Sequence, residues 1–143
     1  MERPLSRRTA RKQAFLNLYQ SDVNDCPLGP TMERWREYRG NLQEYAVTLA
    51  RGVEEEQEQL DALLSEVSVG WPVHRMSAVD RSILRLALYE MLFVDDVPPE
   101  VAVNEAVELA RGFSSDEAPS FVGGVLRGAE LKAQGKVGHG GRG

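Results

Sequence analysis

Apolar residues recur at intervals of three and four along most of this chain, which is the spacing of one face of an α-helix. The longest such run extends from about Asn41 to Ser68, and Glu54, Glu55 and Glu56 within it are typical of a solvated helix face. No stretch alternates between apolar and polar residues as a half-buried strand does, and no Asn-Gly hairpin turn occurs. The pattern therefore predicts an all-α fold.

Cap and turn residues divide the chain into about six or seven helices. The predicted helices span about residues 7–20, 31–40, 41–68, 78–94, 100–111 and 115–131, with one short helical turn after residue 72. Ser6, Thr31 and Ser77 are the expected N-caps of the first, second and fourth helices. Pro99 suits the first turn of the fifth helix, where its missing N–H costs no hydrogen bond. The helix at 78–94 is apolar nearly all round, which predicts that it is the central one.

The apolar content of 42% in 143 residues suffices for one domain, or for two small lobes that share a core. Trp71 follows the third helix and is expected to be an anchor between lobes. Gly123 and Gly124 interrupt the last helix, where each glycine costs about 1 kcal/mol against alanine, so we expect a close backbone approach to another helix or to a ligand there. Residues 135–143 contain five glycines and are expected to be disordered.

Composition argues against several classes of protein. No apolar run could span a membrane and no signal peptide is visible, which together with a single cysteine favours the cytoplasm. Cys26 and His74 are far apart in sequence and have no activating context, so we expect no catalytic residue, no metal site and no cofactor. A set of carboxylates is expected to pair with Arg81 and Arg85 rather than to act as acid and base: Asp80, Glu90, Asp95 and Asp96.

The first twelve residues carry a charge opposite to that of the rest of the chain. Their local net charge is +4, whereas the whole chain is at −5 and the remainder is therefore at −9. On a helical wheel the cations share the side of Phe15, Leu18 and Tyr19, so we expect a basic rim at the edge of the core. Cations at a helix N-terminus oppose the helix dipole by about 0.3–1 kcal/mol each. This placement favours binding of RNA or DNA phosphate over the alternative, a solvated terminal charge run.

Three stretches of the chain, in this order, resemble the NusB family of transcription antitermination factors. Residues 79–90 run into residues 96–110, and Phe-Val-Gly-Gly-Val-Leu follows at 121–126. The basic segment at residues 6–19 is similar to the arginine-rich first helix of that family. The resemblance covers about residues 5–132 and is most specific over residues 79–126.

The resemblance implies two helical lobes within residues 1–134, an N-terminal lobe at about 5–68 and a C-terminal lobe at about 71–132. It also implies binding of the single-stranded boxA element of ribosomal RNA leader transcripts, together with a small ribosomal protein called NusE. That pair joins the elongating RNA polymerase and other Nus factors and keeps transcription processive, and no catalysis is implied. The apolar helical surfaces leave open whether the chain also forms a homodimer.

Site residues are carried over from the family by position. The residues that match its arginine-rich motif, and would bind RNA phosphates and base edges, are Arg7, Arg8, Arg11 and Lys12. Tyr19 and Phe121 match aromatic positions that would stack on unpaired bases, although core packing is an equal alternative for Tyr19. Asp80 matches an acidic position expected to face the ribosomal protein. Ser120 and Gly123 depart from the lysine and asparagine common in the family, which puts more weight on the first helix.

Two other interpretations are possible at this point. Some ribosomal RNA methyltransferases carry a similar helical domain as an N-terminal module, but this sequence has no strand–Gly-loop–helix unit of a cofactor-binding domain. A helix bundle that binds only protein is the second alternative, and it leaves the cations around Arg8 without a purpose. Titration with RNA separates this protein-only alternative from the RNA-binding interpretation.

Overall fold

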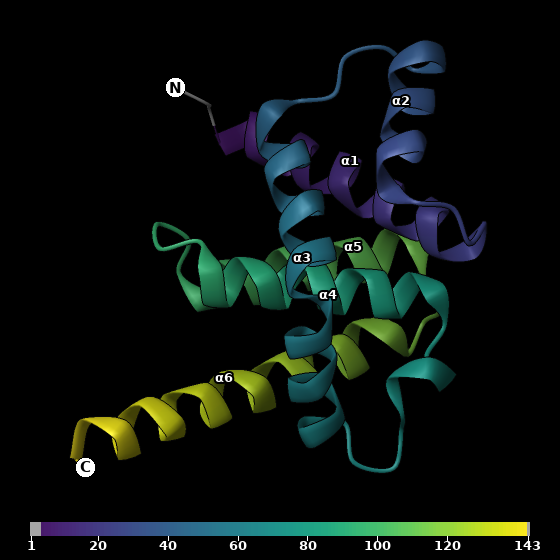
Figure 1. Ribbon diagram of the computed structural model, residues 1–143. Helices are drawn as coiled ribbons and strands as arrows, with labels where there is room; N and C mark the ends of the chain where they lie inside the picture. The colour runs from purple at the N-terminus through teal and green to yellow at the C-terminus, as the bar shows by residue number, and fades with distance from the viewer. Residues whose placement is uncertain (1–3, 143) are drawn as a thin grey trace.

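The computed structural model describes the backbone of residues 4–142 and the side chains of residues 7–134. This part of the chain contains no strand, so the all-α expectation is confirmed (Figure 1). The elements follow in the order α1 (Pro4–Val23), α2 (Leu28–Tyr38), α3 (Glu44–Val67), a 3-10 turn η1 (Val73–Arg75), α4 (Ala78–Phe93), α5 (Pro99–Phe113) and α6 (Ala118–Arg142). Within the described residues, no helix has the length and apolarity needed to cross a membrane.

Helix α4 is the central element, as its apolar pattern predicts. It packs against α1, α3, α5 and α6. Ile83, Leu84 and Leu88 are fully buried in it. Because one core cluster of buried side chains continues from α1 through α3 and α4 into α5 and α6, the helices share a single core. The lobe boundaries at about residues 68 and 71 stay a prediction.

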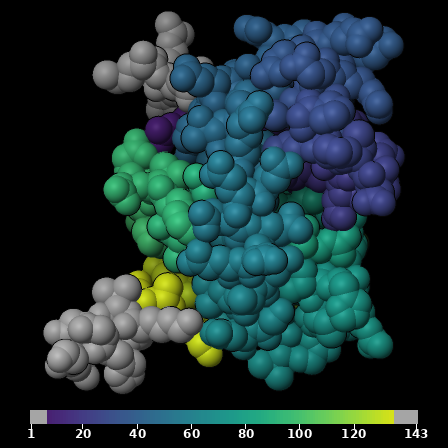
Figure 2. Space-filling view, in the orientation of Figure 1, coloured from purple at the N-terminus to yellow at the C-terminus, as the bar shows by residue number. Residues whose placement is uncertain are grey.

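Helix α1 lies across α3 and α4, and its buried positions follow the helical spacing. Ala10, Ala14 and Phe15 are at most 1% exposed. Helix α2 packs on α1 and α3, while α5 and α6 pack on each other and on α4. Figure 2 shows α3 running down the middle of one face, with α5 in green beside it. This packing places the first half of α1 next to α4 and α5.

The helix starts agree with the sequence at two of the four positions predicted from three caps and one proline. Ser77 caps α4, since its hydroxyl accepts a hydrogen bond of 3.1 Å from the backbone N–H of Asp80, and α5 begins at Pro99. The N-cap prediction for Ser6 is wrong, because α1 already begins at Pro4. Thr31 is also wrong as an N-cap: it lies inside α2, where its hydroxyl donates to the carbonyl oxygen of Pro27. A hydroxyl one turn into a helix can bond back to the preceding turn, so a Ser or Thr alone does not fix the start.

Glycines allow two close approaches between helices. A Cβ at Gly52 in α3 would overlap the ring of Tyr89 in α4, so only glycine fits there. The close approach predicted for Gly123 is confirmed, since a Cβ there would lie 3.4 Å from a methyl group of Val107 in α5. At Gly124 nothing among the described residues lies within 4 Å of the Cβ direction, so the predicted approach to another helix is wrong there and only the approach of a ligand stays a prediction.

Other expectations are wrong for reasons of packing. Trp71 does not anchor two lobes, because its side chain is 51% exposed. Arg81 and Arg85 reach Asp22 and Asp61, each at 2.8 Å, instead of the acids near them in sequence. These pairs join α4 to α1 and α3, since both arginines point across to neighbouring helices.

Helix α6 continues through the Gly-rich segment to Arg142. The side chains of residues 135–143 lie outside the described residues, and the disorder expected for this tail stays a prediction.

Candidate nucleic-acid interface

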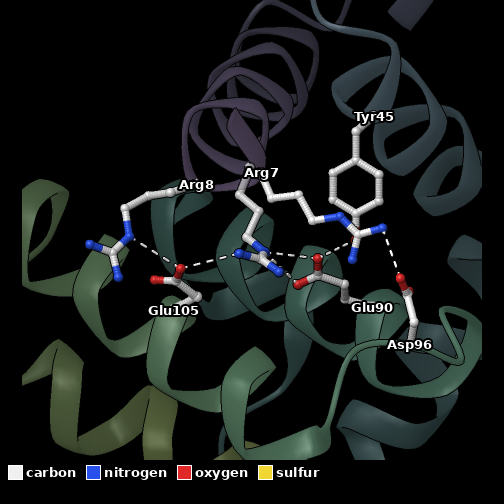
Figure 3. A network of polar contacts seen from close by, with 7 residues as sticks. Arg7, Arg8, Tyr45, Glu90, Asp96 and Glu105 are labelled. Atoms are coloured by element: carbon white, nitrogen blue, oxygen red, sulfur yellow. Dashed lines mark hydrogen bonds and ion pairs between the residues drawn. The ribbon is translucent and has the colours of Figure 1, made fainter. Parts of the chain in front are cut away.

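The basic residues of α1 meet a row of carboxylates from α4, from α5 and from the connection between these helices. Figure 3 shows guanidinium and carboxylate groups alternating along this row, with Arg8 and Glu105 near one end and Arg7 and Asp96 at the other. Glu90 lies between these ends. The first turns of α1 are therefore fixed by charge pairs as well as by apolar packing.

Arg11 is the buried centre of this row. Its Nε donates to both carboxylate oxygens of Glu90, at 2.9 and 2.8 Å, and its Nη1 donates to Glu105 at 3.1 Å. The Arg11 side chain is only 8% exposed and that of Glu90 only 2%. The hydroxyl of Tyr45 in α3 also donates to Glu90, at 2.5 Å. The sequence placed Arg11 on an open basic rim, whereas its guanidinium group is enclosed between carboxylates.

Tyr45 belongs to the same buried network. Burial raises the pKa of its hydroxyl above the ordinary value, and the hydrogen bond to Glu90 raises this pKa further, because the bond is made only by the neutral form. The phenol therefore stays protonated and remains a donor to Glu90 at neutral pH.

Arg7 is half-buried at the other end of the row. Its guanidinium group lies 4.4 Å from the centre of the Tyr45 ring and 3.1 Å from the Asp96 carboxylate. The hydrogen bond to Asp96 raises the pKa of Arg7 above its ordinary value. The Asp96 side chain is 68% exposed, so water and ions can reach this pair.

Arg8 and Lys12 are the exposed cations of this surface. The Arg8 side chain is 69% exposed, and its Nε lies 3.2 Å from the same Glu105 oxygen that accepts from Arg11. The ammonium group of Lys12 lies 5.6 Å from the ring centre of Phe113, which is 40% exposed at the end of α5. Lys12 makes no ion pair among residues 7–134.

A groove of about 280 Å³ runs between α1 and α5 at this point. Its α1 side is lined by Arg8, Arg11 and Lys12. Its α5 side combines the carboxylates of Glu105 and Glu108 with the apolar side chains of Leu109 and Phe113. The arrangement offers cations for phosphate oxygens beside an exposed aromatic face, which is the combination that unpaired nucleotides require. Among the described residues, no three His, Cys, Asp or Glu side chains gather into a group that could hold a metal ion.

The aromatic residues expected at the interface differ in their placement. Tyr19 is half-buried, 6.2 Å from Phe15, and Phe15 in turn lies 5.1 Å from Phe113. Tyr19 therefore continues a short aromatic run that leads from the groove into the core. Phe121 is half-buried in α6 and packs against the core cluster. Within the described residues, no ring contact joins Phe121 to α1.

Asp80, the residue expected to face a protein partner, lies in the first turn of α4. It is half-buried, and its carboxylate accepts a hydrogen bond of 2.7 Å from the hydroxyl of Ser114 after α5. This bond ties the start of α4 to the connection between α5 and α6.

Sequence reasoning missed three residues of this interface: Tyr45, Glu105 and Phe113. Glu90 and Asp96 were recognised as ion-pair partners but were assigned to the wrong arginines. The excess of positive charge in residues 1–12 was the available signal, because a half-buried cationic helix requires acids from elsewhere in the fold. Which acids pair with the arginines depends on how α4 and α5 cross α1, and hydrophobic periodicity does not determine that crossing.

The chain is similar to proteins of one family. The NusB family model matches residues 8–130. A transcription antitermination protein NusB from Rubrobacter xylanophilus is 73% identical over 136 residues, which cover 95% of this chain and 98% of the relative. A solved structure of NusB from T. maritima has a TM-score of 0.79 at 36% identity, covering 91% of this chain and 93% of that one. A crystal structure of antitermination factors NusB and NusE in complex with double-stranded RNA gives a TM-score of 0.80 at 26% identity, covering 89% of this chain and 97% of that one.

Proposed function

This chain belongs to the NusB family and is a transcription antitermination factor, and we propose that it binds boxA-type single-stranded RNA through the α1–α5 groove. The small ribosomal protein NusE is its proposed partner in that complex. Together they would join the elongating RNA polymerase and other Nus factors in the cytoplasm and keep transcription of ribosomal RNA processive. The role is one of binding, without a chemical step.

The observation that carries the proposal is the pairing of Lys12 with the exposed ring of Phe113, beside Arg8. Stacking of a base on an aromatic side chain contributes about 1–3 kcal/mol and needs no particular base. Cations at the rim attract the phosphates on either side of that base and hold the strand in register. Arg8, Lys12 and Phe113 together thus supply both contacts that a single strand makes.

The four cations carried over from the family take different roles in this proposal. Arg8 and Lys12 contact RNA directly, since both are exposed. Arg11 acts as a positioning residue, because its guanidinium donates to Glu90 and Glu105 and is buried. Arg7 is intermediate, being half-buried but paired with an exposed carboxylate.

Tyr19 and Phe121 are secondary in this proposal. Both are half-buried, so each offers only part of its ring to a base. The structure of a relative with NusE and double-stranded RNA supports RNA and NusE as partners of this chain. Asp80 at the start of α4 remains the proposed contact for NusE, and its hydrogen bond to Ser114 would hold it in place.

Titration with a boxA-type single-stranded RNA at several salt concentrations tests the proposal. The Arg8→Ala/Lys12→Ala variant should bind more weakly, and its plot of log affinity against log salt should be shallower by about 0.7 for each phosphate that the protein no longer neutralises. Arg34→Ala/Arg36→Ala is the matched control, because it removes two exposed cations from α2 and changes the net charge equally. Equal affinities and slopes for the two variants would show that the α1–α5 groove is not the RNA site.

A further inference from the structure

The basic character of α1 is largely neutralised by the fold. Three arginines of the helix face three carboxylates: Arg7 with Asp96, Arg8 with Glu105, and Arg11 with Glu90 and Glu105. A local charge that is strongly positive by sequence is therefore nearly balanced across this surface. Lys12, with no ion pair in the described residues, is the cation that stays available.

Two of these carboxylates occupy the place that a phosphate would take. Asp96 and Glu105 lie 3.1 and 3.2 Å from the guanidinium groups of Arg7 and Arg8, at the long end of the range in which an N–H group also holds a phosphate oxygen. A guanidinium group has five N–H donors, so a phosphate can either displace the carboxylate or bind beside it to the remaining N–H groups. In both cases the negative charge of the carboxylate opposes the phosphate.

Exposure separates these two acids from Glu90. The Glu90 side chain is 2% exposed and also accepts from Tyr45, so RNA cannot reach it. Asp96 is 68% exposed, whereas Glu105 is only 14% exposed and also accepts from buried Arg11, although its partner Arg8 is 69% exposed. An exposed ion pair contributes only about 0–1 kcal/mol, so an incoming phosphate can displace Asp96 from Arg7. At Glu105 a phosphate instead competes for the exposed guanidinium group of Arg8 while the carboxylate keeps its bond to Arg11.

We propose that Asp96 and Glu105 compete with RNA phosphates for Arg7 and Arg8, and so set an upper limit on the affinity of this surface for RNA. The inference rests on the proposed function of the α1–α5 groove. Because phosphate contacts carry no sequence information, the acids weaken binding of any single strand to a similar degree. Recognition then depends more on base contacts at the groove than on charge.

A matched pair of neighbouring acids provides the test. Asp96→Asn and Asp95→Asn change the net charge equally, but Asp95 is exposed and forms no ion pair within residues 7–134. Relative to Asp95→Asn, Asp96→Asn should bind a boxA-type single strand about two- to five-fold more tightly, the range of an exposed ion pair. The salt slope should become steeper by up to about 0.7, one additional phosphate contact. An unrelated single strand of equal length should gain by a similar factor.

A second pair tests the other acid. Glu105→Gln should tighten RNA binding relative to Glu100→Gln, because Glu100 is exposed on the same helix but does not line the groove. Thermal unfolding of each variant verifies that the fold is kept.

A third experiment tests whether Asp96 acts through Arg7. In an Arg7→Ala background, Asp96→Asn should change RNA binding no more than Asp95→Asn does, because the effect of Asp96 is exerted through Arg7.

In the alternative hypothesis, Asp96 and Glu105 orient the arginines toward RNA and so strengthen binding. Weaker binding by Asp96→Asn, or an effect equal to that of Asp95→Asn, would overturn the inference. If Arg8→Ala/Lys12→Ala still weakens binding in that case, the groove remains the RNA site and only the competition by carboxylates is refuted. If neither set of variants changes binding, the proposed site itself is refuted.

Discussion

The buried pair between Arg11 and Glu90 allows a sharp prediction about stability. Arg11→Met keeps much of the apolar stem but removes the guanidinium group, which leaves the Glu90 carboxylate with a single donor, the hydroxyl of Tyr45. The two side chains are 8% and 2% exposed, so water cannot replace the missing partner. Breaking a buried pair from one side costs about 3–5 kcal/mol. For a chain near this length, that corresponds to a fall in Tm of roughly 6–20 °C.

Thermal and urea unfolding of Arg11→Met and Arg8→Met measure this difference. Arg8 is the matched control, because it is a neighbouring arginine that also contacts Glu105 but whose side chain is 69% exposed. Its substitution should cost about 1 kcal/mol at most. Equal losses of stability in the two variants would refute the assignment of Arg11 as a buried structural cation.

Removal of the whole polar network around Arg11 tests what causes the loss of stability in Arg11→Met. The triple variant Arg11→Met/Glu90→Leu/Tyr45→Phe leaves no carboxylate of Glu90 and no hydroxyl of Tyr45 to be unpaired. It should therefore be more stable than Arg11→Met alone, since apolar replacement of a buried pair is often neutral or stabilising. A triple variant less stable than Arg11→Met would show that packing, and not the unpaired charge, determines the loss.

Three further predictions concern the packing, the groove and the network. Gly52→Ala should destabilise the fold by about 1–3 kcal/mol, because its methyl group would overlap the Tyr89 ring. Gly124→Ala should instead stabilise the fold by about 0.5–1 kcal/mol, because that position in α6 is open. Urea unfolding measures both changes. Phe113→Ala should weaken binding of single-stranded RNA by about 1–3 kcal/mol while Phe113→Trp retains it, and equal binding by wild type and Phe113→Ala would exclude a stacking role. The raised pKa of Tyr45 means that the folded protein holds the phenol proton more tightly than the unfolded chain does. The stabilisation from this difference is complete below about pH 10 and is lost as the pH rises above it. In unfolding experiments at alkaline pH, wild type should therefore lose stability faster than Tyr45→Phe.

Helical periodicity determined most of the fold in advance. The all-α class, the central position of residues 78–94 and the cap at Ser77 all depend on local spacing and local hydrogen bonds, and all are confirmed. The predicted starts of α1 and α2 were wrong because Ser6 and Thr31, residue types that often cap a helix, lie inside these helices. Trp71 was wrong because size and hydrophobicity do not fix burial in a loop.

The candidate site was only partly predictable for a similar reason. The charge of residues 1–12 located the surface, and the helical wheel placed its cations near Phe15. That wheel could not show that Arg11 would be enclosed by Glu90, which is 79 residues away in sequence. Such pairs depend on how α1 crosses α4 and α5, and that crossing is set by the whole core.

Photo-crosslinking of a boxA-type single-stranded RNA to the wild-type chain, with the crosslinked residues identified by mass spectrometry, locates the RNA site without any substitution. We expect crosslinks to gather at the groove between α1 and α5, at Arg8, Lys12 and Phe113, and to be weaker at Arg11, which lines the groove but is only 7% exposed. Addition of NusE should keep these crosslinks. Crosslinks confined to α2 or to the solvated face of α3, with none at the groove, would contradict the proposed RNA site.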